Sequence, residues 1–162
     1  MPHDITGWIH TIAALIALLT GSIILAKTKG TLLHKRVGRF YGIAMMIVCV
    51  TSFMMYRLHG KIGILHFFAF VSTVTLCLGM LPLYFKGFKS PIMNHLAMMY
   101  WSVIGLYSAF VAEVLTRLPM IFEIENTYGI FYAIVGFSAG VVSMIGGFFF
   151  KKKKLIWQEQ FT

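Results

Sequence analysis

The chain has 162 residues, of which 59% are hydrophobic and only 12% charged, and its mean hydropathy is +0.82. Soluble domains carry about 25% charged residues, so this composition excludes a soluble globular domain and predicts an integral membrane protein. The net charge of +9 could suggest a nucleic-acid partner, but the basic residues gather at the ends of apolar runs, as topology signals do, and we expect no nucleic-acid binding.

Five apolar runs predict transmembrane helices. In chain order they cover residues 8–26, 37–56, 62–84, 92–114 and 128–150. Each is long enough to cross a hydrocarbon core of about 30 Å, and they lack the short alternating pattern of barrel strands. The connections are short, so neighbouring spans should lie antiparallel. We therefore expect an all-α integral membrane fold, with residues 1–162 forming a single five-helix transmembrane bundle.

The distribution of lysine and arginine predicts the orientation of the bundle. If the amino terminus lies outside, the cytoplasmic segments hold eleven basic residues and the outer segments hold three. The eleven are Lys27, Lys29, Lys35, Arg36, Arg39, Lys86, Lys89, Lys151, Lys152, Lys153 and Lys154, and the three are Arg57, Lys61 and Arg117. Because basic residues are retained in the cytoplasm, the carboxyl terminus should lie on the cytoplasmic side of the plasma membrane. The first run lacks a basic n-region and a cleavage site, so it should be retained as a span.

Four histidines fall inside or at the edges of the first four spans, and the predicted orientation sorts them into two pairs. His10 and His66 lie at the outer ends of spans one and three, whereas His34 and His95 lie at the inner ends of spans two and four. Ionisable groups are costly in lipid and usually point into the bundle, and histidine is a common axial ligand of haem. The pattern predicts two b-type haems (heme b), about 20 to 25 Å apart along the membrane normal.

Small residues accompany these histidines at helical spacing. They include Ala14, Ala17 and Gly21 after His10, and Gly38 and Gly42 after His34. Small residues beside a ligand leave room for a flat macrocycle, but they also let helices approach each other closely, and the sequence fits both uses. A non-haem metal site, a proton site, or purely structural hydrogen bonding by the histidines are the alternatives to haem.

Charged residues near the two predicted sites have candidate roles as well. Basic residues surround His34 and could pair with haem propionates, although the positive-inside signal alone also explains them. They are Lys27, Lys29, Lys35, Arg36 and Arg39. Glu113 follows His95 after five helical turns, so it should lie on the same face of span four, at the outer level. There it could accept protons from a quinol, or it could pair with Arg117 at the helix end.

The same residues resemble a widespread family of small bacterial membrane proteins, known as predicted membrane proteins of unknown function. The most specific part is the pattern KGT-x-x-HKR-x-GR-x-Y over residues 29–41. The remainder comprises His10, His66, His95–Met98 and Glu113. This resemblance implies a fold but no activity.

In layout, the chain is also similar to the diheme transmembrane cytochromes b. That similarity implies that His10, His34, His66 and His95 are axial ligands on a core of four helices and that the fifth span is peripheral. It is an analogy of layout and not of sequence motifs.

The expected function is a diheme membrane cytochrome that carries electrons across the bilayer. Its donor would be a quinol or an ascorbate-like molecule, and its acceptor a species such as ferric iron. The main rival is a metal- or proton-coupled transporter that uses the outer histidines and Glu113. A third class is an assembly subunit without chemistry of its own, and a homo-oligomer is compatible with any of the three.

Overall fold

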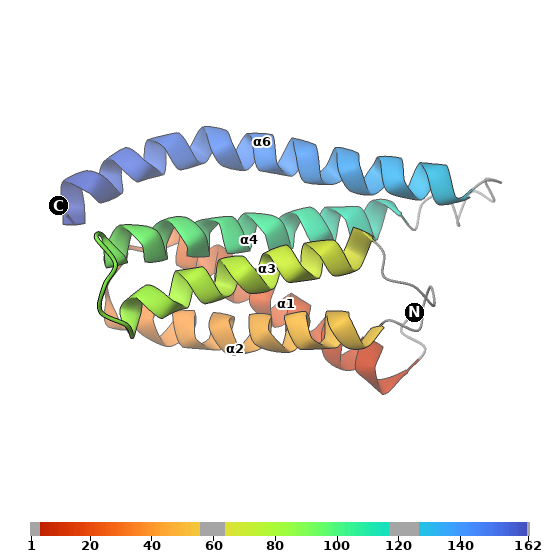
Figure 1. Ribbon diagram of the computed structural model, residues 1–162, viewed down its shortest axis with the longest axis horizontal. Helices are drawn as coiled ribbons and strands as arrows, with labels where there is room; N and C mark the ends of the chain where they lie inside the picture. The colour runs from red at the N-terminus through yellow and green to blue at the C-terminus, as the bar shows by residue number, and fades with distance from the viewer. Residues whose placement is uncertain (1–3, 56–63, 117–126, 162) are drawn as a thin grey trace.

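The computed structural model describes residues 4–55, 64–116 and 127–161, which form helices and the turns between them. The helices are α1 (Ile5–Ala26), α2 (Leu32–Met54), α3 (Ile64–Met80), η2 (Leu81–Leu83, a short 3-10 helix), α4 (Pro91–Leu115) and α6 (Thr127–Phe161) (Figure 1). Among the described residues, five helices are long and apolar enough to cross a membrane, the third including η2. The expected all-helical membrane fold is therefore confirmed, and the protein is a multi-pass membrane protein.

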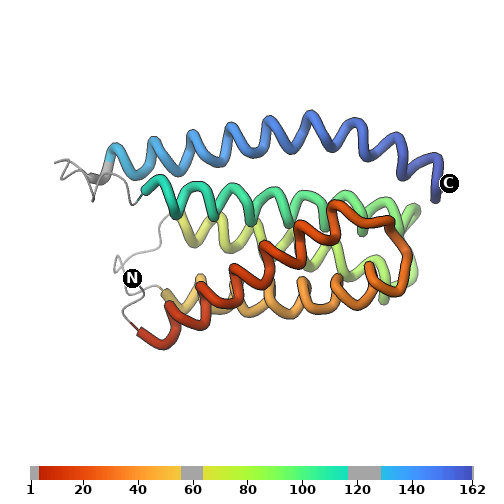
Figure 2. Tube along the Cα trace, turned by 180° about the vertical axis from the view of Figure 1, so that it is seen from behind, coloured from red at the N-terminus to blue at the C-terminus, as the bar shows by residue number. Residues whose placement is uncertain are grey.

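Four of the helices form a ring, and the fifth lies outside it. Each of α1 to α4 packs against its neighbour in sequence, and α1 also packs against α4. Consequently α1 and α3 face each other across one diagonal of the ring, and α2 and α4 across the other. Helix α6 packs along α4 on the outside (Figures 1 and 2). Helix α6 is therefore peripheral to the ring of α1 to α4.

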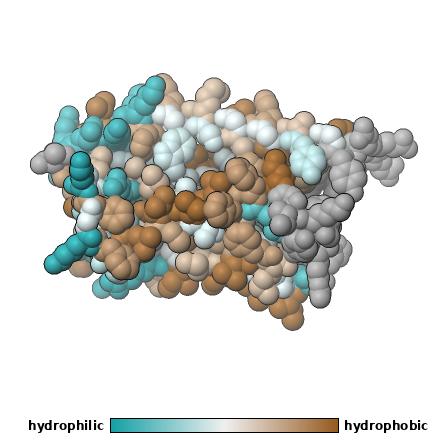
Figure 3. Space-filling view, in the orientation of Figure 1, coloured by the Kyte–Doolittle hydropathy of each residue, from teal (hydrophilic) through white to brown (hydrophobic). Residues whose placement is uncertain are grey.

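The two ends of the bundle differ in charge. The α1–α2 turn, residues 84–90 and the end of α6 all lie at one end, which we call the basic end (Figure 1). Hydrophilic side chains gather there, whereas hydrophobic side chains cover the middle of the visible face (Figure 3). The opposite end, which we call the N-terminal end, holds the first residues of α1, α3 and α6. Apolar side chains exposed between the two ends contact lipid.

Two helix boundaries differ from the sequence-based prediction. Helix α2 begins at Leu32 and not near residue 37, because the Thr31 hydroxyl caps it by accepting a hydrogen bond from the His34 backbone N–H at 3.1 Å. Helix α6 continues through the four lysines to Phe161, since lysine is a good helix former. Its 35 residues span about 52 Å, well beyond the hydrocarbon core. The predicted limits at residues 56 and 62 lie outside the described residues.

The centre of the ring is tightly packed. Tyr41 from α2 is fully buried, and its hydroxyl forms a hydrogen bond of 2.8 Å with Ser102 of α4 across the diagonal. Gly21 of α1 makes room for it, because a Cβ at this glycine would lie 3.1 Å from both Tyr41 and Val103. The middle of the bundle is therefore a packed core that separates the histidines of the two ends.

Candidate functional site

His34 and His95 meet at the basic end. His34 lies in the first turn of α2 and His95 in the second turn of α4, on opposite sides of the ring. Their ring centroids are 6.4 Å apart, and the ring planes are nearly perpendicular at 89°. Both side chains are half-buried. The structure thus brings together the inner pair that the sequence proposed, across the diagonal of the bundle.

The ring of His95 is held in one tautomer. Its Nδ1 lies 2.7 Å from the backbone carbonyl oxygen of Gly79, and since a carbonyl only accepts, His95 Nδ1 carries the proton and donates it. Gly79 is among the last residues of α3, where helix carbonyls lack an intrahelical donor. A Cβ at Gly79 would lie only 2.7 Å from Met99 Sδ, so glycine permits this approach of α4. His95 Nε2 is left with its lone pair.

The ring of His34 has an unusual environment. Its Nδ1 is buried and has no hydrogen-bond partner among the described residues. A buried polar atom of this kind normally has a partner, so the position is suited to a ligand or a metal. Lys29, in the turn before α2, is close enough to His34 to act on it electrostatically.

Gly38 of α2 leaves open space one helical turn from His34. Gly38 follows His34 one turn further along the helix, and a Cβ built there would meet no atom within 4 Å. At Gly42, another turn on, the nearest atom is Met80 Cε at 4.0 Å. These glycines differ from Gly21 and Gly79, which serve close helix packing. Gly38 is therefore not needed for close helix packing in this structure, whereas Gly21 and Gly79 are.

His10 lies at the N-terminal end and bonds to α2. Its Nδ1 is 2.9 Å from Thr51 Oγ1, and the Thr51 hydroxyl donates to the carbonyl of Ile47 at 2.7 Å. Because the single hydroxyl proton is already used, His10 Nδ1 must be the donor. His10 therefore has the same tautomer as His95, with Nε2 available as a ligand. His66, half-buried in the first described turn of α3, lies at the same end on the diagonal from α1.

The charged residues proposed for these sites lie at the expected ends of the bundle. Lys35, Arg36 and Arg39 are exposed on the first two turns of α2. Glu113 is exposed near the end of α4 and is close enough to act on His10 electrostatically. Its predicted partner Arg117 lies outside the described residues. Among the described residues, no group of three or more His, Cys, Asp or Glu side chains is arranged to hold a metal ion.

Two contributors to the site were missed by sequence reasoning, namely Thr51 and Gly79, which orient the imidazoles of His10 and His95. Lys29 was predicted near His34 and acts on it electrostatically. The capping role of Thr31 had a signal, since threonine commonly precedes a helix. No signal in the sequence could identify the partners of His10 and His95. Those contacts depend on which faces of α2 and α3 turn toward α1 and α4.

The comparisons with known proteins give a family. A family model described as "Predicted membrane protein (DUF2306)" matches residues 7–150. No curated protein and no solved structure matches the chain. The matched segment includes all four histidines considered above.

Proposed function

The chain belongs to the DUF2306 family of predicted membrane proteins, and we propose that it is a membrane cytochrome that carries electrons across the bilayer. The observation that carries this proposal is the pair His34 and His95 at the basic end. Two imidazoles bound on opposite sides of one metal ion, with bonds of about 2 Å, have ring centroids about 6 Å apart. The observed 6.4 Å fits such a pair.

The surroundings of the pair also fit a haem. A porphyrin supplies four ligand nitrogens, so two histidines complete the coordination, whereas a zinc or copper site normally needs three or more protein ligands. Gly38 leaves open space one helical turn from His34 on α2. One-electron transfer is the chemistry that a bis-histidine haem supplies.

The residues of the chain have distinct roles in this proposal. His34 and His95 would hold the iron, and the carbonyl of Gly79 fixes the tautomer and orientation of His95. Lys29, together with the exposed Lys35, Arg36 and Arg39, would offset the negative charge of propionates. The packed core around Tyr41 excludes water from the middle of the bundle.

His10 and His66 would form the second haem site at the N-terminal end. They come from diagonally opposite helices, as His34 and His95 do, and His10 already has the tautomer of a histidine that binds through Nε2. Glu113 lies near His10 and would accept protons from a quinol or a similar two-electron donor. With basic residues retained in the cytoplasm, this end faces outward.

The proposal is tested by purifying the protein in mild detergent from cells supplied with a haem precursor. We expect a strong Soret band, sharpened bands on reduction, and two haems per chain. His34→Ala and His95→Ala should each reduce the haem content to one haem per chain. Leu33→Ala and Asn94→Ala, exposed neighbours of the two histidines, should retain both haems.

The open space beside His34 gives a second test of the same site. Gly38→Leu should fill the space and lower the haem content, whereas Gly140→Leu, where a Cβ also meets no atom within 4 Å, should leave it unchanged because Gly140 lies on α6. A folded, helical protein that stays colourless after expression with haem and after incubation with hemin would contradict the proposal.

A metal- or proton-coupled transporter is the second candidate, and the proximity of Glu113 to His10 favours it. Its site would be the N-terminal end alone. A colourless preparation that retains one metal ion per chain, lost in both His10→Ala and Glu113→Gln, would support this function instead of electron transfer.

A further inference from the structure

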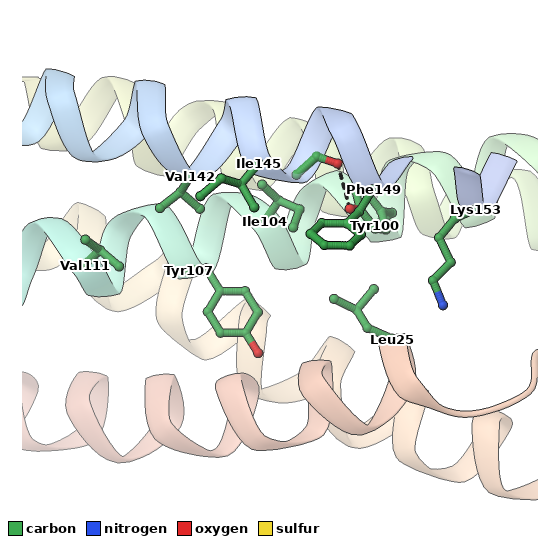
Figure 4. A pocket seen from close by; sticks show the side chains of 10 residues that line it. Leu25, Tyr100, Ile104, Tyr107, Val111, Val142, Ile145, Phe149 and Lys153 are labelled. Atoms are coloured by element: carbon green, nitrogen blue, oxygen red, sulfur yellow. Dashed lines mark hydrogen bonds between the residues drawn. The ribbon is translucent and has the colours of Figure 1, made fainter. Parts of the chain in front are cut away.

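An apolar cavity of about 350 Å³ lies between α1, α4 and α6. Ile104, Tyr107 and Val111 of α4 form one wall, and Val142 and Ile145 of α6 form another (Figure 4). A water molecule occupies about 30 Å³, and a methylene group is of similar size. The cavity therefore holds about a dozen methylene groups. It is therefore large enough for a substantial part of an acyl chain.

The cavity exists because α6 packs closely on α4 but not on the middle of α1. A Cβ at Gly146 would lie 2.8 Å from Ile104 Cγ2, and the Tyr100 hydroxyl donates to the Gly146 carbonyl at 2.8 Å. On the other side, the Tyr107 side chain points toward α1, where its hydroxyl lies 2.5 Å from Ser22 Oγ (Figure 4). The wall between these two contacts is apolar.

Positive charge gathers where the cavity reaches the basic end. Lys153 of α6 lines the cavity and its side chain extends toward Leu25 of α1 (Figure 4). Lys29 lies nearby, with its ammonium 6.0 Å from the centroid of the buried Trp157 ring. Burial and then the charge of Lys153 lower the pKa of Lys29 to about 8. Among the described residues of the basic end, Glu159 is the one acidic side chain.

This combination matches the two parts of an anionic lipid. An apolar cavity at membrane depth takes a hydrocarbon chain, and two neighbouring lysines at the headgroup level attract a phosphate. An anion between Lys29 and Lys153 would remove their mutual repulsion. A neutral headgroup such as that of a quinone would leave this repulsion in place, so charge complementarity favours a phospholipid.

We propose that the cavity between α1, α4 and α6 binds an acyl chain of an anionic phospholipid whose phosphate is bound by Lys153. The charge of Lys29, whose ammonium donates to the carbonyl oxygens of Ile24, Leu25 and Lys27, attracts the same phosphate from nearby. The lipid connects α6 to α1, which otherwise approach each other at the basic end through Lys29 and Trp157. The cavity uses a different face of α4 from His95, and Val142 and Lys153 take no part in the haem proposal, whereas Lys29 would act in both.

Native mass spectrometry of the full chain, released from nanodiscs of mixed phosphatidylglycerol and phosphatidylcholine, tests the site. We expect one retained phosphatidylglycerol per chain. Since a lysine near the membrane surface contributes about 1 kcal/mol to anionic lipid binding, Lys153→Gln should weaken retention about fivefold. Lys154→Gln removes the same charge from an exposed position and should have little effect.

A cavity-filling variant separates the site from general attraction of lysines for lipid. Val142→Phe should abolish retention while leaving helix content and the elution volume of the protein unchanged. Equal losses in Lys153→Gln and Lys154→Gln would overturn the proposal in favour of diffuse surface charge. Equal retention of phosphatidylcholine, or no retained lipid on the folded wild-type protein, would overturn it as well.

Discussion

Two of the four histidines hold their Nδ1 proton in a hydrogen bond to a neighbouring helix. His10 donates to Thr51 of α2, and His95 donates to the carbonyl of Gly79 in α3. Hydrogen bonds of this kind fix the orientation of a metal-binding imidazole and increase its basicity. At the residue scale, His10 and His95 are therefore each held by a group that orients the imidazole.

Replacing Thr51 should weaken the haem site at the N-terminal end. Thr51→Val keeps the shape of the side chain but removes the acceptor of the His10 proton, and loss of such a partner lowers metal affinity by about 10- to 100-fold. Hemin titration of the apo-protein should therefore show one weakened site, and Thr51→Ser should restore it. Ser52→Ala, which loses a bond only to its own helix, is the control. Two unchanged sites in Thr51→Val would contradict this role.

Lys29 should make stability depend on pH in the alkaline range. Its pKa is lowered to about 8, whereas that of an unfolded lysine is about 10.4. The groups that face it are Lys153, His34, the Trp157 ring and the carbonyl oxygens of Ile24, Leu25 and Lys27. The folded protein binds this proton less tightly than the unfolded chain does, so protonated Lys29 costs stability below about pH 8. The free energy of unfolding should rise between about pH 8 and 10.4.

The measurement is denaturant unfolding in neutral detergent across this pH range. Lys29→Met should lack the rise that the wild type shows, and Lys153→Gln should shift the start of the rise to higher pH because it removes the second cause of the lowered pKa. Identical pH profiles for the wild type and Lys29→Met would contradict the burial of Lys29 beside Lys153.

Residue types alone could identify the histidines but not their partners. The inner pair followed from the depth of His34 and His95 in the sequence, because depth is set by span boundaries. The hydrogen bonds to Thr51 and Gly79 depend on how each helix is rotated about its axis. The rotation of each helix is determined by packing. Hydropathy does not show which face of a span packs inward, because nearly every position in the spans is apolar.

At the scale of the elements, α6 is held to the bundle by its contact with α4. Gly146 is the point of closest approach, and Tyr100 and Trp157 add an aromatic contact with ring centroids 6.1 Å apart. The long α6 was underestimated from the sequence because hydropathy ends at the lysines, although the helix does not. Trp157 beyond the lysines is buried against α4 and indicates why the helix continues.

Enlarging Gly146 should loosen α6. In Gly146→Ala the new Cβ would lie 2.8 Å from Ile104, a branched side chain with little freedom to move. Overpacking of this kind costs about 1 to 3 kcal/mol, measurable as earlier unfolding in detergent. Gly140→Ala, on the same helix and facing open space, should be neutral or slightly stabilising. Equal stability of the two variants would argue against the close α4–α6 contact.

At the scale of the whole molecule, the charge difference between the two ends predicts the orientation. Because basic residues are retained in the cytoplasm, the carboxyl terminus should lie inside. A fluorescent protein fused there should fluoresce, and a phosphatase active only outside the cytoplasm should be inactive at the same position. Fusions placed between α2 and α3 should give the reverse. Phosphatase activity at the carboxyl terminus would mean that the bundle has the opposite orientation, with the inner and outer sites exchanged.

The central claim is that His34 and His95 hold one haem iron between α2 and α4. Their ring planes are at 89°. If the two imidazoles held an iron at this angle, ferric haem would give a highly anisotropic low-spin EPR signal, whereas parallel imidazoles would give a rhombic one. Low-temperature EPR of the oxidised protein should therefore contain the anisotropic signal, lost in both His34→Ala and His95→Ala but retained in Leu33→Ala. Haem that gives only a rhombic signal, or an anisotropic signal that survives both substitutions, would contradict the claim.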